Sequence, residues 1–225
     1  MLTYYAPFDH VNEQARIAII GITPGLTQAR NALVAFQKAR SDGADVTAAL
    51  RSAKVAASFS GPMRSNLIAL LNEIKLGPVL GIDSCESLFA QHSSLAHFTS
   101  VLRYPVTVRG ENYSGSPGIL TNEFLQREFE EWFVPEITKL PRAVLVPLGP
   151  AVTLALESLV VRGLIDERRV LAGLPHPSGA NAERIAYFCA RKARELLSKK
   201  VNPAKLDLQK SALLSKVESL RSVAT

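Results

Sequence analysis

The chain has 225 residues, of which 47% are hydrophobic and 20% are charged, a size and composition typical of one globular domain rather than a disordered chain. No apolar run reaches the roughly 20 residues that span a bilayer, and residues 1–15 lack the basic start of a signal peptide, so we expect a cytoplasmic protein without membrane contact. The two cysteines, Cys85 and Cys189, suit a reducing compartment and cannot form a four-cysteine metal or iron–sulfur site.

Basic residues gather toward the C-terminus. The net charge of the chain is +6, but from Arg184 onward ten Lys and Arg face three acidic residues, a local net charge of +7. The rest of the chain is therefore nearly neutral. Such a segment is either a solvated helix surface or a surface that binds phosphate groups, and the sequence allows both.

Buried-strand and helix patterns alternate along the chain. Strands are predicted at 16–21, 96–102, 143–148 and 169–174. Helices are predicted at 27–40, 46–57, from Pro62, at 121–140, 150–161, after 178–181 and at 205–222, and 105–120 is predicted to be a long loop. This order predicts an α/β fold, a three-layer sandwich in which helices cover a short, mostly parallel four-stranded sheet. We expect one domain over 1–200 and a basic amphipathic helix as an extension over 201–225.

Two loops follow the first and the last predicted strand, at the sheet end where α/β proteins bind ligands. The first is Gly21-Ile22-Thr23-Pro24-Gly25, whose glycines allow a backbone to approach a ligand closely. The second is His176-Pro177-Ser178, in which prolines on both sides hold the histidine stiffly. Taken singly, each loop is a weak signal, because such residues also serve purely structural turns.

Together and in this order, the two loops resemble the motifs of the uracil-DNA glycosylase superfamily. That superfamily has Gly-x-x-Pro after its first strand and His-Pro-Ser after its last, and the first motif here is most similar to the Gly-x-Asn-Pro-Gly of the mismatch-specific and single-strand-selective branches. Ser58-Phe59-Ser60 resembles the segment whose phenylalanine stacks on the extruded base, and 99–102 resembles a strand end that often carries a base-reading asparagine. The resemblance spans roughly residues 16–197.

The resemblance implies a DNA glycosylase that binds an extruded base, of the uracil type or otherwise deaminated, and hydrolyses its N-glycosidic bond. The implied catalytic residues are His176, which would donate to the base oxygen as the bond breaks, and Thr23. The base would lie against Gly21, Ile22, Pro24, Gly25, Phe59 and Ser100. DNA phosphates would contact Ser60, Arg64, Pro177, Ser178, Gly179 and Asn181. DNA is then the expected partner, no cofactor or metal is expected, and a monomer is favoured.

This chain departs from the family pattern at the water-positioning and base-reading residues. Thr23 stands where the family has Asp or Asn, Ile22 where one branch has Glu, and Ser100 or Thr99 where the asparagine is expected. A threonine hydroxyl can orient a water but is a poor base at neutral pH. Polar residues that could substitute are Gln28, Asn31, Glu111, Asn112 and Asn181. One alternative is therefore a non-catalytic module of the same fold that binds a nucleobase or nucleic acid, and another is an unrelated α/β protein that self-associates through its last helix.

Overall fold

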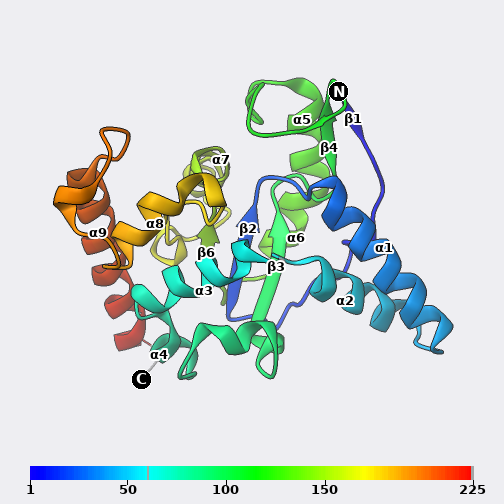
Figure 1. The fold of residues 1–225 in the computed structure, drawn as a ribbon. Coiled ribbons are helices and arrows are strands. Elements are labelled where there is room, and N and C mark those ends of the chain that lie inside the picture. The colour runs from blue at the N-terminus through cyan, green and yellow to red at the C-terminus, as the bar shows by residue number, and fades with distance from the viewer. Residues whose placement is uncertain (60, 224–225) are drawn as a thin grey trace.

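The computed structural model describes residues 1–59 and 61–223 and has a mixed α/β architecture (Figure 1). The strands are β1 (Leu2–Thr3), β2 (Ile17–Gly21), β3 (Ala96–Ser100), β4 (Val106–Val108), β5 (Glu111–Asn112) and β6 (Val144–Pro147). The α-helices are α1 (Leu26–Ser41), α2 (Val46–Ala57), α3 (Pro62–Glu73), α4 (Leu76–Leu80), α5 (Glu123–Glu128), α6 (Val134–Thr138), α7 (Pro150–Val161), α8 (Ala182–Phe188) and α9 (Pro203–Val223).

The central sheet is parallel and has the strand order β3-β2-β6. Its middle strand β2 is buried from Ile17 to Ile20, because neighbours cover both of its faces, and this explains the unbroken apolar run in the sequence. The fourth strand predicted at 169–174 is wrong except for one parallel bridge between Leu145 and Val170. Arg169 still belongs to a 3-10 turn, and Pro175 has no N–H to donate, so a longer ladder cannot form here.

A second, antiparallel sheet joins the N-terminus to part of the region predicted as a long loop. Its strand order is β1-β4-β5, with Leu2 opposite Thr107 and Val108 opposite Glu111. The prediction of a structureless 105–120 loop was therefore wrong. The two residues between β4 and β5, Arg109 and Gly110, both have positive φ angles of 53° and 85°, as tight hairpins require.

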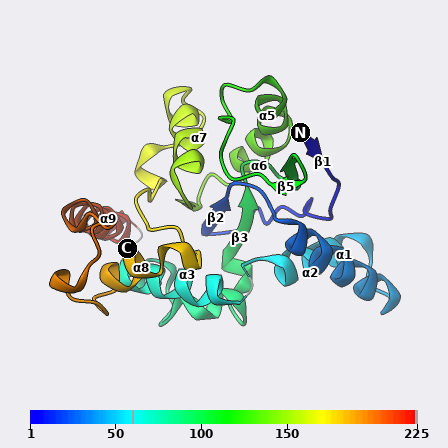
Figure 2. The ribbon, with the colours of Figure 1, turned by 45° about the horizontal axis from the view of Figure 1, so that its top comes forward.

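Two hydrophobic clusters lie on opposite faces of the central sheet, beneath the two groups of helices that Figure 2 shows on either side of it. One contains Ile17 and Ile19 of β2 and packs under α3, α4 and α8. The other contains Ala18 and Ile20 and packs under α5, α6 and α7. The alternation along β2 thus sends successive side chains into different cores, as the two-residue period of a strand dictates.

The helix predicted at 121–140 is present, but its middle is wider than an α-helix. Residues Phe129–Phe133 form a π-helical turn between α5 and α6, and Pro135 lies at the start of α6. Such turns often occur at functional sites. Here the turn places the buried Glu136 beneath the sheet, where it meets partners described below.

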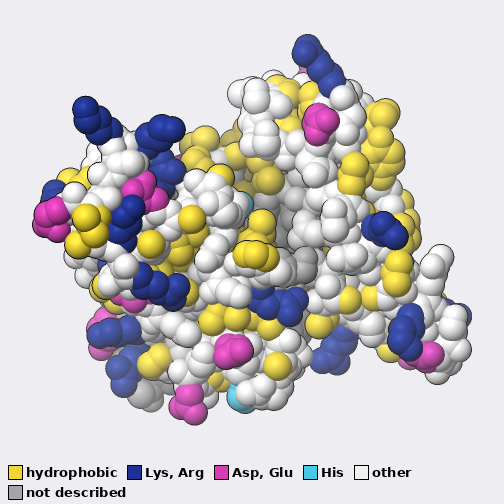
Figure 3. Space-filling model, viewed as in Figure 1, with side chains coloured by type: hydrophobic (Ala, Val, Ile, Leu, Met, Phe, Trp, Pro, Cys, Tyr) yellow, Lys and Arg dark blue, Asp and Glu magenta, His cyan; other side chains and the backbone are white. Residues whose placement is uncertain are grey.

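The C-terminal helix α9 packs onto the body of the protein. Leu206, Leu213 and Val217 are buried in the same cluster as α3, α4 and α8, and Lys210 forms an ion pair with Glu73. In Figure 3, Lys and Arg side chains gather on the surface over α8 and α9. Within residues 1–59 and 61–223, no helix combines the length and apolar character that crossing a bilayer requires.

Candidate functional site

The two loops selected from the sequence lie at the carboxyl end of the central sheet, where the strand order reverses. From β2 the chain passes through α1 and α2 to α3 and α4 on one face, whereas from β6 it passes to α7 on the other. A crevice opens between loops that leave a sheet in opposite directions, and such crevices are the usual ligand sites of parallel α/β sheets. The candidate site is therefore the region over the carboxyl ends of β2 and β6.

Three polar side chains, one from the first loop itself and two from outside it, hold this loop in place. The Thr23 hydroxyl donates to the Tyr104 carbonyl at 3.0 Å and accepts from the Val106 N–H at 3.1 Å. Gln28 accepts from the Gly25 N–H through Oε1 at 2.8 Å, and Asn112 accepts from the Leu26 N–H at 3.1 Å. The hydroxyl proton of Thr23 is already donated to a backbone carbonyl, so this hydroxyl stabilises the loop and cannot donate a hydrogen bond to a ligand.

His176 lies in the second loop with a defined orientation of its ring. Its Nδ1 accepts the backbone N–H of Ser178 at 3.2 Å, and burial lowers the pKa of its imidazole. Both effects favour a neutral ring, and an acceptor at Nδ1 leaves the proton on Nε2. His176 is therefore arranged as a neutral hydrogen-bond donor through Nε2–H.

A cavity of ≈ 490 Å³ lies beside His176. Ile22 of the first loop and the segment from Leu148 to Val152 after β6 line it, and the 114–116 segment closes its side. Gly149 has a φ angle of 98°, which residues with a side chain rarely adopt, so the turn of the β6 loop beside His176 favours glycine. This volume lies within the range of small-molecule sites.

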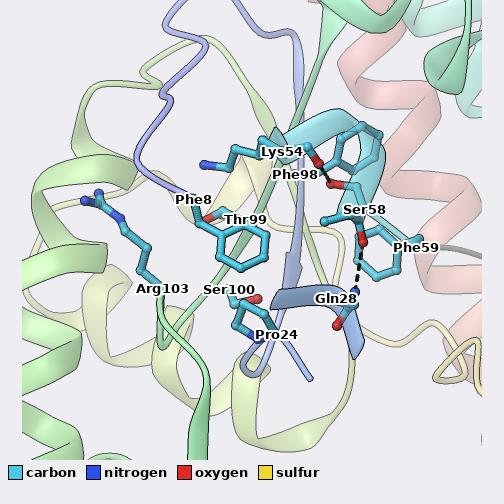
Figure 4. A pocket seen from close by; sticks show the side chains of 11 residues that line it. Phe8, Pro24, Gln28, Lys54, Ser58, Phe59, Phe98, Thr99, Ser100 and Arg103 are labelled. Atoms are coloured by element: carbon cyan, nitrogen blue, oxygen red, sulfur yellow. Dashed lines mark hydrogen bonds between the residues drawn. The ribbon is translucent and has the colours of Figure 1, made fainter. Parts of the chain in front are cut away.

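A second, much smaller cavity of ≈ 30 Å³ lies on the other side of the first loop (Figure 4). Pro24, Phe59 and Ser100, three of the predicted base-binding residues, line it. Gly21 lies against the same place, because a Cβ on it would come within 3.3 Å of the Ser100 hydroxyl. The predicted residues are thus brought to one crevice, but His176 and Phe59 line separate cavities on either side of the 21–25 loop.

Phe59 is held in a strained backbone conformation. Its φ angle is 43°, a region that bulky residues rarely occupy and that is enriched at ligand sites. Arg64 fixes this turn, since its guanidinium donates to the carbonyls of Ser58 and Phe59 at 3.0 and 2.9 Å. The ring of Phe59 contacts Phe98 of β3 at a centroid distance of 5.9 Å. Arg64, predicted to contact DNA phosphate, also shapes the aromatic side of the crevice.

Phe8 and Thr99 line the small cavity, and sequence reasoning missed Phe8. In Figure 4 the Phe8 ring is drawn between Thr99 and Pro24, and all three line the cavity. The Thr99 hydroxyl is buried and has no hydrogen-bond partner among the described residues. An unpaired buried hydroxyl beside a cavity is a polar group that a ligand or a water would satisfy.

The residues predicted to bind phosphate cluster around the second loop. The Ser178 hydroxyl accepts from Asn181 at 3.2 Å, and Asn181 in turn accepts from Arg184 at 3.0 Å. The Pro177 carbonyl accepts from Asn66 at the start of α3, while Gly179 is exposed. Ser60, the remaining member of this set, lies outside the described residues.

A buried cluster of charged side chains lies next to the small cavity. The Glu136 carboxylate accepts hydrogen bonds from His97 Nε2 at 2.6 Å, Arg103 Nε at 2.7 Å and Lys54 Nζ at 3.1 Å. Burial raises the pKa of Glu136, but the Lys54, His97 and Arg103 interactions outweigh burial and hold this pKa below its usual range. Lys54 and Arg103 also line the small cavity, so the ion cluster supports its wall.

We expect the protein to lose stability as the pH falls from about 6.5 toward 4. Burial lowers the pKa of His97 to about 4, whereas an unfolded histidine titrates near 6.5. Between these values only the unfolded chain takes up the proton, so the stability present above pH 6.5 is lost as the pH falls through about 4. The lowered pKa values of His176 and Glu136 act in the same direction.

Urea unfolding at pH 7.5, 5.5 and 4.5 measures this loss, which we expect to reach about 3 kcal/mol for a shift of this size. His97→Gln keeps a donor and an acceptor but does not titrate, so it should remove most of the pH dependence. An equally steep dependence in His97→Gln would show that another group is responsible.

The crevice carries no evident metal site. Among the described residues, no group of three or more His, Cys, Asp or Glu could hold an ion. The described residues that line the two cavities also include no carboxylate. The arrangement can therefore bind and polarise a neutral or anionic ligand, whereas a carboxylate base is absent from the described lining.

Comparison with known proteins gives one informative relative. The chain is 35% identical to the uncharacterized protein YoxB of Bacillus subtilis (strain 168) over 192 residues, which are 84% of this chain and 75% of YoxB. This chain belongs to the YoxB family. The name of that relative carries no activity, so the site of this YoxB-family protein has to be interpreted from its own geometry. No family model matches the sequence, and no solved structure matches the chain.

Proposed function

We propose that this protein is a divergent uracil-DNA glycosylase-like protein that captures an extruded nucleobase over the 21–25 loop and promotes hydrolysis of its N-glycosidic bond. The three-layer glycosylase architecture, DNA as the partner and a monomeric cytoplasmic protein are parts of this proposal. The parallel β3-β2-β6 sheet, with ligand loops after its strands, is consistent with it.

The neutral, oriented imidazole of His176 is the observation that carries the proposal. A base that leaves its sugar develops negative charge on its carbonyl oxygens. A preorganised hydrogen-bond donor beside such an oxygen stabilises the transition state. His176 offers Nε2–H for this purpose because Ser178 occupies Nδ1. A neutral imidazole is also a weaker acid than imidazolium, so it donates a hydrogen bond without surrendering its proton.

The opposite side of the crevice supplies an aromatic face and an edge for recognition. In this proposal the base lies over the Gly21 backbone, with Phe59 on its face and the small Ser100 at its edge. Arg64 holds Phe59 in its strained turn, so the aromatic ring is positioned before a ligand arrives. A serine reads a base edge less selectively than an asparagine, because it has one donor instead of two.

The electrostatics of the crevice favour an anionic product. Lys54 and Arg103 line the small cavity, and Glu136 neutralises only part of their charge. Their field stabilises a base that leaves as an anion. The basic surface over α8 and α9 lies beside the second loop and would add salt-dependent affinity for the DNA backbone (Figure 3).

A second function, base binding without cleavage, is favoured by one observation. The Thr23 hydroxyl bonds to Tyr104 and Val106, so it has no proton to donate and only one lone pair left for a water. With no carboxylate in the described lining, water activation is the weakest part of the enzymatic proposal. A binder of the same architecture needs the pocket but not the water.

A panel of labelled oligonucleotides separates the two functions. Single- and double-stranded oligonucleotides would carry uracil, hypoxanthine or a G·T mismatch, with an undamaged oligonucleotide as the control. Strand scission after alkali measures base release, and fluorescence anisotropy at about 50 and 200 mM salt measures binding.

We expect scission at one of the altered bases. Tighter binding to an oligonucleotide with an altered base, without any scission, would contradict the enzymatic function and support base binding without cleavage. Equal binding of every oligonucleotide with no scission, or no binding at all, would overturn both.

A further inference from the structure

A basic pocket lies at the opposite end of the central sheet from His176. It has a volume of ≈ 500 Å³. Three elements line it: the start of β6 at Val144, the 3-10 turn Glu167–Arg169 and the C-terminal half of α9. Val144 and Leu220 contribute apolar surface to it. Because it lies at the amino end of β6, this pocket is separate from the crevice described above.

Arg169 is the central basic residue of this pocket. Its Nη1 donates to the carbonyls of Leu140 and Ala143 at 2.8 and 2.9 Å, which fixes the guanidinium against the protein. Among the described residues no acceptor bonds to its Nε or Nη2, and no carboxylate forms a salt bridge with it. Burial lowers the pKa of Arg169, and the nearby Asp166 carboxylate opposes this shift, but the hydrogen bonds of Asp166 go to Arg168. A half-buried guanidinium that is held by carbonyls and has two free donors is preorganised to receive an anion.

The pocket has an excess of positive charge. Its one carboxylate, Asp166, is already paired with Arg168 at 2.6 Å and accepts the Arg168 N–H at 2.9 Å. Arg142 donates only to the neutral Gln14. Lys216 has no ion-pair partner in the described part of the chain and lies on the α9 side of the pocket. Among the described residues, Arg142, Arg169 and Lys216 thus line one opening without a salt-bridge partner, and Asp166 is the single carboxylate beside them.

From this arrangement we infer that the pocket binds the phosphate group of a small phosphomonoester. A dianionic phosphate matches the planar donors of Arg169 and the charges of Arg142 and Lys216. The apolar side chains of Val144 and Leu220 would contact the organic part of the ligand. A pocket of this volume suits a small molecule, and the test below distinguishes such a ligand from DNA.

Calorimetric titration with phenyl phosphate, inorganic phosphate and phenol tests the inference on the full chain. Phenyl phosphate combines the charge with an apolar ring, so it should bind more tightly than inorganic phosphate, and phenol should not bind. Arg169→Met and Lys216→Met should each weaken phenyl phosphate binding by about tenfold or more. Arg162→Met is the matched control, because Arg162 is exposed, pairs with Glu130 and does not line the pocket.

Arg169→Met removes two hydrogen bonds to backbone carbonyls and could therefore disturb the fold. Lys216→Met is the second variant, because Lys216 lies on the surface of a helix and its loss should leave the fold intact. Failure of phenyl phosphate to bind would overturn the inference, as would equal weakening by Arg162→Met. Loss of affinity for duplex DNA in Lys216→Met, with no phenyl phosphate binding in the unmodified protein, would reassign the pocket to the nucleic-acid backbone and overturn it as well.

Discussion

Replacing Glu136 with glutamine is expected to lower the free energy of unfolding by about 3–5 kcal/mol. The carboxylate of Glu136 faces Lys54, Arg103 and His97 in the interior, where its own side chain is fully buried. Glutamine removes the negative charge but keeps the volume, so two cations remain buried without a counter-ion. The cost is that of uncompensated charge, because packing hardly changes.

Glu130→Gln is the matched control for this prediction. Glu130 lies in the π-helical turn just before α6 and pairs with Arg162, but both side chains are about 40% exposed. Exposed pairs contribute about 0–1 kcal/mol. Denaturant unfolding can be followed through the single tryptophan, Trp132, whose carbonyl accepts from Arg103. Similar losses in the two variants would show that the buried cluster is not a major source of stability.

Replacing His176 with alanine is expected to reduce base release by about 100- to 1,000-fold, the usual cost of removing one preorganised donor to a developing anion. The expectation rests on the proposed glycosylase function. His176→Gln retains an N–H donor on a longer, more flexible side chain, so we expect it to keep part of the activity.

The assay is alkali-induced scission of the altered oligonucleotide that the unmodified protein cleaves. His92→Ala is the control, because His92 is exposed and lies outside both cavities. Unchanged activity in His176→Ala would remove His176 from the reaction and with it the main support for the proposed mechanism. Unchanged unfolding free energy in the same variant would confirm that the loss is chemical.

The sequence predicted the parts of the fold that depend on local pattern. The buried run ending at Gly21 and the run at 143–148 formed neighbouring parallel strands, and both motif loops lie at their carboxyl ends or beside them. The β4–β5 hairpin was missed because its strands are short and partly polar, so the two-residue period that identifies a strand is hardly visible. Its turn, Arg109-Gly110, was the one available signal.

The site was predictable only in part, because its decisive contacts join distant segments. Lys54 lies in the helix predicted at 46–57, and nothing near it in sequence indicates that Glu136, 82 residues away, provides its counter-charge. Thr23 was recognised as unusual, yet its partner carbonyl belongs to Tyr104, 81 residues away. Sequence motifs locate loops, whereas hydrogen-bond partners across the fold decide what each side chain in a loop can still do.

The N-terminal segment has a consequence for any ligand of the small cavity. Phe8 lines this cavity together with Thr99 and Pro24. The residues that follow Phe8 are held by two hydrogen bonds, from the Tyr104 hydroxyl to Asp9 at 2.5 Å and from Lys54 to the His10 carbonyl at 2.6 Å. A cavity of ≈ 30 Å³ holds about one water. A base therefore enters only molecules in which this segment has moved aside, and its apparent dissociation constant is the intrinsic value divided by the open fraction.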